Sequence, residues 1–380
     1  MSEVSVWLVE AGFPDGFPGV QQDYPAATFP FWGNYFLLDF ALANFAALPS
    51  SGLSVVADFR QRSLEALASS RWESGLFQLQ FLDEGLKQFI QLLKASPADR
   101  VLLASLSFLG DIDSEALLAL CLNLTENLVK IAVGRVPVDI YLAKRKYLIR
   151  ILESFLHRGG VQKQFTRALF AEVLHHSFEL IQETPGLILF QNSLRQFYQE
   201  HLKLAGGGNG SERARLISRL KGIRLPEKET FIEGSAFIKN SFIASGARVA
   251  GYVEGSVIFS DVTVAPGARV VDSVVMNGNR IGARALIYNS LIFPYTADHS
   301  RLANNIGEAA AIGSKRSSAV NDLYPEQIRD GLTVLGANAE IPGGATVEAG
   351  CLVGPDVPYQ HLRALKQIKK GSSVLWNTGR

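Results

Sequence analysis

The apolar residues in the last third of the chain recur every six positions, and this period constrains the fold more than any other feature. An α-helix repeats about every 3.6 residues and a half-buried strand every two, so neither explains a spacing of six. Six residues instead match one side of a triangular coil whose short strands stack into parallel sheets. The recurring residues are Ile258, Val264, Val270, Met276, Ile281, Ile287, Phe293, Leu335, Ile341, Val347 and Val353.

Small residues lie between these apolar positions, as in VAPGARVVDSVV (264–275) and IPGGATVEAGCLV (341–353). Tight corners favour such residues because they need small side chains or unusual backbone angles. We therefore predict a left-handed parallel β-helix. A β-sandwich of alternating strands is the alternative.

The first half of the chain has a different pattern, in which short apolar runs alternate with helix-period stretches. The expected strands are residues 4–9, 53–58, 100–106 and 128–134, and the expected helices are residues 39–48, 62–69, 83–96 and 114–124. This alternation predicts an α/β domain whose parallel or mixed sheet is covered by helices on both faces.

A glycine-rich segment and a break in the six-residue period indicate the expected domain boundaries. AGGGNGS (205–211) is typical of a flexible linker, and the segment 299–331 breaks the six-residue period. The predicted parts are an α/β domain at 1–205, a linker at 206–229, a β-helix at 230–358 with an insertion at 299–331, and a tail at 359–380.

Composition excludes several classes of function. The 37 basic and 36 acidic residues give a formal charge of +1, which does not indicate a nucleic-acid-binding protein. Cys121 and Cys351 are too few and too distant to predict a disulfide framework or a metal site. We find neither a secretion signal nor an apolar run of about twenty residues that would span a membrane, so a cytoplasmic protein is expected.

Two blocks of the chain resemble one enzyme family. YPAATFPFWGNYFLLDFALANFAALPSSGLSVVADFRQRSLEALASSRW (24–72) is similar to a family stretch that reads KPAVPFGGKYRIIDFALSN and ends in a Ser-Leu helix and a tryptophan. FIKNSFIASGARVAGYVEGSVIFSDVTVAPGARVVDSVVMNG (237–278) resembles the opening turns of the same family's β-helix. Weaker similarity is traceable at 138–152 and 193–204. The family is the ADP-glucose pyrophosphorylases, or glucose-1-phosphate adenylyltransferases.

The resemblance implies a nucleotidyltransferase-like, Rossmann-like first domain and transfer of an adenylyl group from ATP to glucose 1-phosphate. Such chemistry needs cations and backbone amides around the phosphates, and carboxylates that hold Mg²⁺. The family's glycine-rich loop is GGxGxRL, whereas this chain has EAGFPDGFPG, in which prolines remove amide donors. Tyr24 replaces the lysine of the Lys-Pro-Ala element.

The positions that match the family's two metal carboxylates are also changed. Leu106 stands at the aspartate of the LAGDH motif, and Phe190 stands at the aspartate of the WRDVGT motif. Asp111 and Asp113 lie close to Leu106 and are possible substitutes, although a helix N-cap explains them more simply. The family's GTADA loop and Glu-Lys-Pro segment have no counterpart. We therefore expect no metal ligands, and Mg²⁺ and ATP as cofactors only if the chain is active.

These departures predict a catalytically silent subunit that regulates or scaffolds glycogen or α-glucan precursor synthesis. The expected partners are further copies of the chain, or an active ADP-glucose pyrophosphorylase subunit, and a small anionic effector. The aromatic segment TFPFWGNYFLLDF (28–40) is either a filled former active site or a contact patch. Candidates for binding the anion are Arg60, Arg62, Lys315, Arg316, Arg329 and the tail residues Lys366, Lys369 and Lys370.

Two other functions stay open from the sequence. One is an active sugar-phosphate nucleotidyltransferase with relocated metal ligands. The other is a β-helix acyltransferase that uses His299, the single histidine between residues 230 and 358, as general base.

Overall fold

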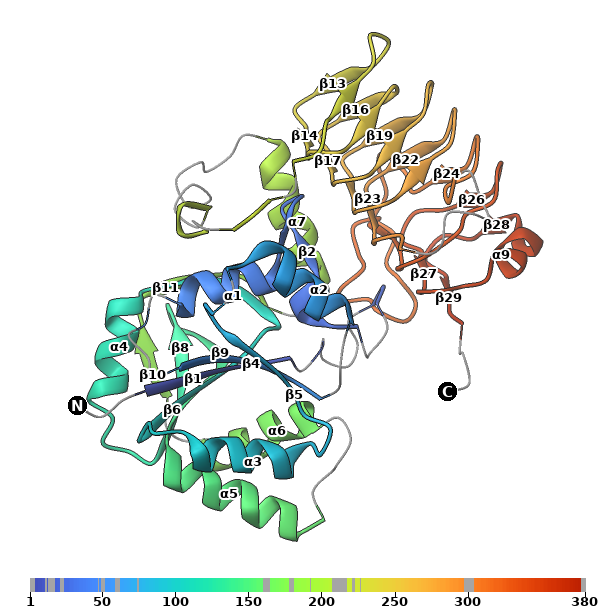
Figure 1. Cartoon of the computed structure of the whole chain (residues 1–380). Coiled ribbons are helices and arrows are strands. Elements are labelled where there is room, and N and C mark those ends of the chain that lie inside the picture. The colour runs from blue at the N-terminus through green and yellow to red at the C-terminus, as the bar shows by residue number, and fades with distance from the viewer. Residues whose placement is uncertain are drawn as a thin grey trace.

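The computed structural model describes residues 4–10, 12, 18–20, 24–46, 48, 52–58, 62–73, 75–159, 165–177, 181–191, 193–206, 217–220, 223–225, 227–296 and 304–376. These residues form an α/β domain followed by a coil of short stacked strands (Figure 1). Both parts of the predicted fold are therefore confirmed. Among the described residues, no helix is long and apolar enough to cross a membrane.

A seven-stranded sheet forms the centre of the α/β domain. In spatial order its strands are β10 (Ile181–Thr184), β8 (Leu128–Val133), β9 (Val136–Lys144), β6 (Arg100–Ser105), β1 (Val4–Val9), β4 (Gly52–Ala57) and β5 (Gln78–Phe81). Strand β9 runs antiparallel to both of its neighbours, whereas β6, β1, β4 and β5 are mutually parallel. The sheet is thus mixed, and its parallel strands end at one common edge.

Helices cover both faces of this sheet (Figure 1). On one face lie α1 (Leu37–Phe45), α2 (Arg62–Arg71) and α4 (Ser114–Leu122), and on the other lie α3 (Leu86–Ala95), α5 (Arg145–His157) and α6 (Phe165–Ser177). Successive residues of β1 point to opposite faces of the sheet. Val6 and Leu8 pack in the core beneath α1, α2 and α4, whereas Trp7 and Val9 pack in the core beneath α3, α5 and α6. Period-two alternation of this kind is what a sheet buried on both faces produces.

Short elements complete the domain beside the sheet. They are the 3₁₀ helix at Ala26–Thr28, the hairpin of β2 (Pro30–Phe31) and β3 (Tyr35–Phe36), the pair of β7 (Phe108–Ile112) and β11 (Gly186–Gln191), and α7 (Leu194–Ala205).

The coil consists of three parallel sheets that run along its length. The first holds β12 (Phe231–Ile232), β15 (Arg248–Val249), β18 (Thr263–Val264) and β21 (Arg280–Ile281). The second holds β13 (Phe237–Lys239), β16 (Tyr252–Glu254), β19 (Arg269–Val271), β22 (Leu286–Tyr288), β24 (Ala311–Ile312), β26 (Thr346–Val347) and β28 (Gln367–Ile368). The third holds β14 (Phe242–Ile243), β17 (Val257–Ile258), β20 (Val274–Val275), β23 (Ser290–Ile292), β25 (Thr333–Leu335), β27 (Leu352–Val353) and β29 (Ser373–Val374).

The apolar period matches the coil turn by turn. Val253 pairs with Val270, and Val270 pairs with Ile287, so one turn takes 17 residues here, since 270 − 253 and 287 − 270 are both 17. Three sides of six residues less one residue give this length, which accounts for the slip of one in the sequence pattern. The apolar residues that carry the period are all buried in the coil.

Two predicted boundaries of the coil are wrong. Within the predicted insertion 299–331, Ile306 bridges Ile281 and Ile341, and β24 pairs with β22 and β26, so this part belongs to the coil. Within the predicted tail 359–380, α9 (Tyr359–Leu365) is followed by β28 and β29, which add a further turn. Helix α9 does not keep the six-residue period, and the sequence pattern therefore stopped there.

Candidate functional site

The carboxyl ends of parallel strands are where ligands bind in open α/β sheets, and the residues that follow β1, β4 and β6 lie at such ends. Glu10 follows β1, Asp58 follows β4, and Leu106 follows β6. Strands β4 and β6 flank β1 on either side. The two carboxylates and the leucine therefore lie along one edge of the sheet.

Glu10 is almost fully buried, and its carboxylate binds backbone amides of its own chain. Oε1 accepts hydrogen bonds from the amides of Gly12 at 2.7 Å and Ala26 at 2.9 Å, and Oε2 accepts one from Ala27 at 2.6 Å. Burial raises the pKa of this carboxyl to about 6, although the three amides partly oppose the shift. At neutral pH the group is mostly ionised, and it is the anion that these three amides hold.

Asp58 adds a second carboxylate to the same edge. Its Oδ1 accepts a hydrogen bond of 3.0 Å from the backbone amide of Thr166, in the first turn of α6. Burial raises the pKa of Asp58, and Arg167 acts in the opposite direction. Asp58 in turn contributes to the raised pKa of Glu10. The local field therefore repels a further anion.

None of the three residues that follow β6 is acidic. Leu106 is fully buried in the apolar core that contains α1, α2 and α4. The hydroxyls of Ser105 and Ser107 lie 2.7 Å apart and bond to each other. A magnesium ion needs oxygen ligands, usually with carboxylates among them, and Leu106 supplies none.

The other positions that were singled out by the family motifs do not restore such a ligand. Phe190 lies in β11 with its backbone opposite Leu109, and its side chain lies outside what the structure describes. Tyr24 is half-buried, stacks edge-on against Phe29 at 5.9 Å, and has its pKa raised to about 12 by burial. Neither residue type provides a charge for phosphate or metal at neutral pH.

The two aspartates considered as substitutes have other partners. The carboxylate of Asp113 caps α4, because Oδ1 accepts hydrogen bonds of 3.0 Å from the amides of Glu115 and Ala116. Asp111 is buried and forms an ion pair of 2.8 Å with Arg219. The residues present therefore do not fit the magnesium site that the resemblance implies. Among the described residues, no three histidine, cysteine or acidic side chains are grouped as a metal site.

The aromatic segment beside this edge is buried between the α/β domain and the coil. Phe29 lies between Phe197 of α7 and Phe293 of the coil, with ring centroids at 5.1 and 5.6 Å. Phe31 and Trp32 are also buried, within one cluster that includes coil residues. Of the two alternatives that the sequence left open, the segment is filled core and not an exposed contact patch.

His201 of α7 lies within this cluster, and no sequence motif indicates its role. Its ring is buried among Phe31, Phe197 and Phe259. Nδ1 lies 2.7 Å from the Phe197 carbonyl, and Nε2 accepts a hydrogen bond of 3.1 Å from the backbone amide of Trp32. Burial lowers the pKa of His201 to about 3, so the ring is neutral.

The predicted anion-binding residues that the structure describes are spread along the coil, and Lys315 and Arg329 lie near carboxylates. Lys315 sits 5.3 Å from the ring centroid of Tyr288 and interacts with Glu254 and Asp272. Arg329 lies 3.9 Å from Glu326. Arg316, Lys366, Lys369 and Lys370 are exposed, and Glu348 accepts a bond from the Lys370 amide. Arg60, His299 and the side chain of Arg62 lie outside the described part of the chain.

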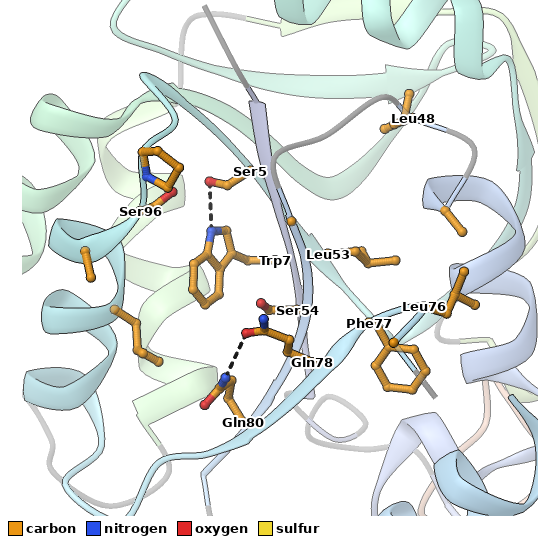
Figure 2. A pocket seen from close by; sticks show the side chains of 16 residues that line it. Ser5, Trp7, Leu48, Leu53, Ser54, Leu76, Phe77, Gln78, Gln80 and Ser96 are labelled. Carbon is orange, nitrogen blue, oxygen red and sulfur yellow. Dashed lines mark hydrogen bonds between the residues drawn. The ribbon is translucent and has the colours of Figure 1, made fainter. Parts of the chain in front are cut away.

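A pocket of about 630 Å³ lies at the opposite, amino-terminal edge of the sheet (Figure 2). Trp7 lines it and donates a hydrogen bond of 3.0 Å to Ser5, while Gln78 and Gln80 bond to each other at 3.3 Å. The described residues that line this pocket are all uncharged. It does not suit a nucleoside triphosphate or a sugar phosphate, because these ligands need cationic partners.

Comparison with known proteins agrees with this architecture. Residues 228–311 match the model of the GlmU-like, C-terminal hexapeptide family. The chain is 29% identical to the glucose-1-phosphate adenylyltransferase of Acetivibrio thermocellus over 149 residues, which cover 38% of this chain and 33% of that protein. It is 32% identical to the enzyme of the same name from Thermomicrobium roseum over 86 residues, which cover 23% of this chain and 18% of that protein.

These matches span a third or less of the relatives' own lengths. The chain is thus similar to glucose-1-phosphate adenylyltransferases over part of its sequence, and it combines an α/β domain with a hexapeptide-type parallel β-helix.

Proposed function

We propose that this chain is a catalytically silent relative of glucose-1-phosphate adenylyltransferases, and that it acts as a regulatory or scaffold subunit in glycogen or α-glucan precursor synthesis. The proposal rests mainly on one observation: the carboxylate of Glu10 accepts hydrogen bonds from the backbone amides of Gly12, Ala26 and Ala27. Backbone amides in such a position are what a nucleotide's phosphates require.

An ionised Glu10 prevents phosphate binding in two ways. It already occupies the donors, and its charge repels a second anion in a low-dielectric environment. Leu106 supports the same conclusion, because an apolar side chain stands where the family places a metal ligand. Losing the amide donors and a metal ligand together removes several cooperating contributions to transition-state stabilisation.

The coil supports a role in assembly. Its first turn exposes large apolar side chains, with exposed fractions of 43% for Phe231, 57% for Ile232 and 50% for Phe237. Terminal turns of a stacked coil leave apolar surface and unpaired strand edges, which contact with another subunit would cover. We propose either a homo-oligomer or a hetero-oligomer with an active adenylyltransferase subunit. Lys315, Arg316, Arg329, Lys369, Arg60 and Arg62 remain the proposed contacts for a small anionic effector.

The second function, an active nucleotidyltransferase with relocated ligands, is favoured by the names of the two similar enzymes. It would have to use Glu10 and Asp58 as metal ligands, because Asp111 is paired with Arg219.

Co-expression with a catalytic adenylyltransferase subunit from the same organism tests the regulatory role. We expect a mixed oligomer by size-exclusion chromatography with light scattering, and a changed effector response of the active subunit. Ile232→Asp with Phe237→Asp should abolish mixing, whereas Val320→Asp, at an exposed position of the segment 313–331, should leave it intact. A chain that never forms a mixed oligomer would rule out this role.

A further inference from the structure

A second pocket, of about 370 Å³, lies at the amino end of β6 beside the start of α5. Its lining includes four cationic residues, Arg100, Lys144, Lys146 and Arg150. Asp99 supplies the single carboxylate among the described lining residues. Lys144, Lys146 and Arg150 lie within seven residues of one another, and the pairing of β6 with β9 brings Arg100 to them.

Two of the cations face each other across neighbouring strands. Arg100 is the first residue of β6, Lys144 is the last residue of the antiparallel strand β9, and the two are direct partners in the strand register. Residues that are directly opposite project to the same face of a sheet, and like charges in such a pair destabilise it. Part of the charge of Lys144 is offset, because its ammonium donates a bond of 2.6 Å to the Thr125 carbonyl and also interacts with Glu126.

The other two cations repeat this arrangement on α5. Lys146 and Arg150 are both exposed and lie four residues apart, which places them on one face of the helix. Like charges at this spacing also destabilise a helix. The first turn of α5 contains no acidic residue. The structure therefore brings two like-charged pairs to one pocket, where a bound anion would relieve both.

We propose that this pocket binds a small phosphorylated molecule that carries at least two negative charges. Its volume lies within the range of small-molecule sites, which is about 300 to 1,000 Å³. Arginine guanidinium groups bind phosphate oxygens in pairs, and the lysines add point charges. Tyr147, which also lines the pocket, offers a hydroxyl and a ring for the uncharged part of the ligand.

This site goes beyond the proposed function, because it lies at the edge of the sheet opposite Glu10. The proposal does not depend on whether the chain transfers adenylyl groups. It is also separate from the basic residues of the coil. Its occupancy is therefore measured by binding, and no activity of the chain is needed as a readout.

Isothermal titration calorimetry of the full chain with inorganic pyrophosphate, in the absence of magnesium, tests the proposal. We expect saturable binding that weakens by about tenfold or more in the double variant Lys146→Gln with Arg150→Gln. Both residues are exposed, so the variant should fold. The charge-matched control is Lys228→Gln with Arg284→Gln, which removes two exposed cations from the coil and should bind as the unmodified chain does.

Thermal unfolding gives a second readout. Without ligand, Lys146→Gln with Arg150→Gln should unfold at an equal or higher temperature than the unmodified chain, because a repulsion has been removed. Pyrophosphate should raise the unfolding temperature of the unmodified chain and of the control, but not of this variant. Three results would overturn the proposal: no binding of pyrophosphate, unchanged affinity in the Lys146 and Arg150 variant, or an equal loss of affinity in the control.

Discussion

The carboxylate oxygen Oε2 of Glu10 lies 2.6 Å from the backbone nitrogen of Ala27, at the carboxyl end of β1. This contact joins the first strand to the segment that follows the glycine-containing loop. A buried side chain of the chain itself thus holds the amides that would otherwise be available to an anionic ligand. The same contact makes stability depend on pH in a way that can be measured.

Glu10 should lower stability as the pH rises. Burial raises its pKa in the folded chain from 4.5 to about 6, so the folded state binds the proton more tightly than the unfolded state. The stabilising contribution is complete below pH 4.5 and is lost as the pH rises through 6. We expect the unfolding free energy of the unmodified chain, relative to that of Glu10→Gln, to fall by about 2 kcal/mol between pH 4 and 7.5. Urea unfolding of both proteins across this range measures it, and a constant difference would refute the assignment.

His201 should show the opposite dependence. Its pKa is lowered from 6.5 to about 3 in the folded chain, so stability is present above pH 6.5 and is lost as the pH falls toward 3. His201→Phe should lack this pH-dependent loss. It should also be less stable at pH 7 by about 1 to 3 kcal/mol, because the Trp32 amide loses its acceptor. His157→Phe, at an exposed position, serves as control and should change stability by less than about 0.5 kcal/mol.

Gly33 should stabilise the contact between the α/β domain and the coil. It has a φ of +83°, and a Cβ atom there would lie 2.7 Å from the Phe242 ring. Gly75 has a similar φ of +96° but no neighbour within 4 Å of such an atom. Alanine at either position adopts a strained positive φ, so the difference in unfolding free energy between the two variants reports the contact with Phe242. We expect Gly33→Ala to be less stable than Gly75→Ala by about 1 to 3 kcal/mol in chemical denaturation. Equal losses would show that Phe242 moves aside freely.

Asp39, in the DFALAN block, should contribute to stability and not to chemistry. Its carboxylate lies 2.6 Å from the Arg71 guanidinium and 3.0 Å from the Trp72 indole nitrogen, and all of these side chains are buried. Asp39→Asn leaves a buried cation without its counter-charge, which costs about 3 to 5 kcal/mol. Glu84→Gln removes a carboxylate from an exposed pair with Lys87 and should cost less than about 1 kcal/mol. Similar losses in the two variants would contradict the prediction.

Sequence patterns predicted those parts of the fold that repeat locally. The spacing of Val264 and Val270 identified the coil because each side of a turn buries one residue in register with the next turn. The strand of residues 4–9 and the helix at 114–124 were recognisable because the apolar residues of each lie close together in the sequence. The boundary at 358 was wrong because α9 changes the period before β28 resumes the coil.

The candidate site was harder to predict because its contacts join distant residues. Glu10 was not singled out from the sequence, and nothing in the sequence indicated that Ala26 and Ala27 would be its partners. His201 and Trp32 are 169 positions apart and meet only in the folded chain. Arg100 and Lys144 likewise become neighbours through an antiparallel pairing that the sequence does not specify.

Adenylyl transfer is the reaction that most directly tests the proposed silence of the chain. The full chain should be incubated with ATP, magnesium and glucose 1-phosphate, with a catalytic glucose-1-phosphate adenylyltransferase as positive control, and ADP-glucose should be quantified. We expect no ADP-glucose above the level that is measured without protein. Turnover that is lost in Glu10→Gln or Asp58→Asn would refute the proposed silence.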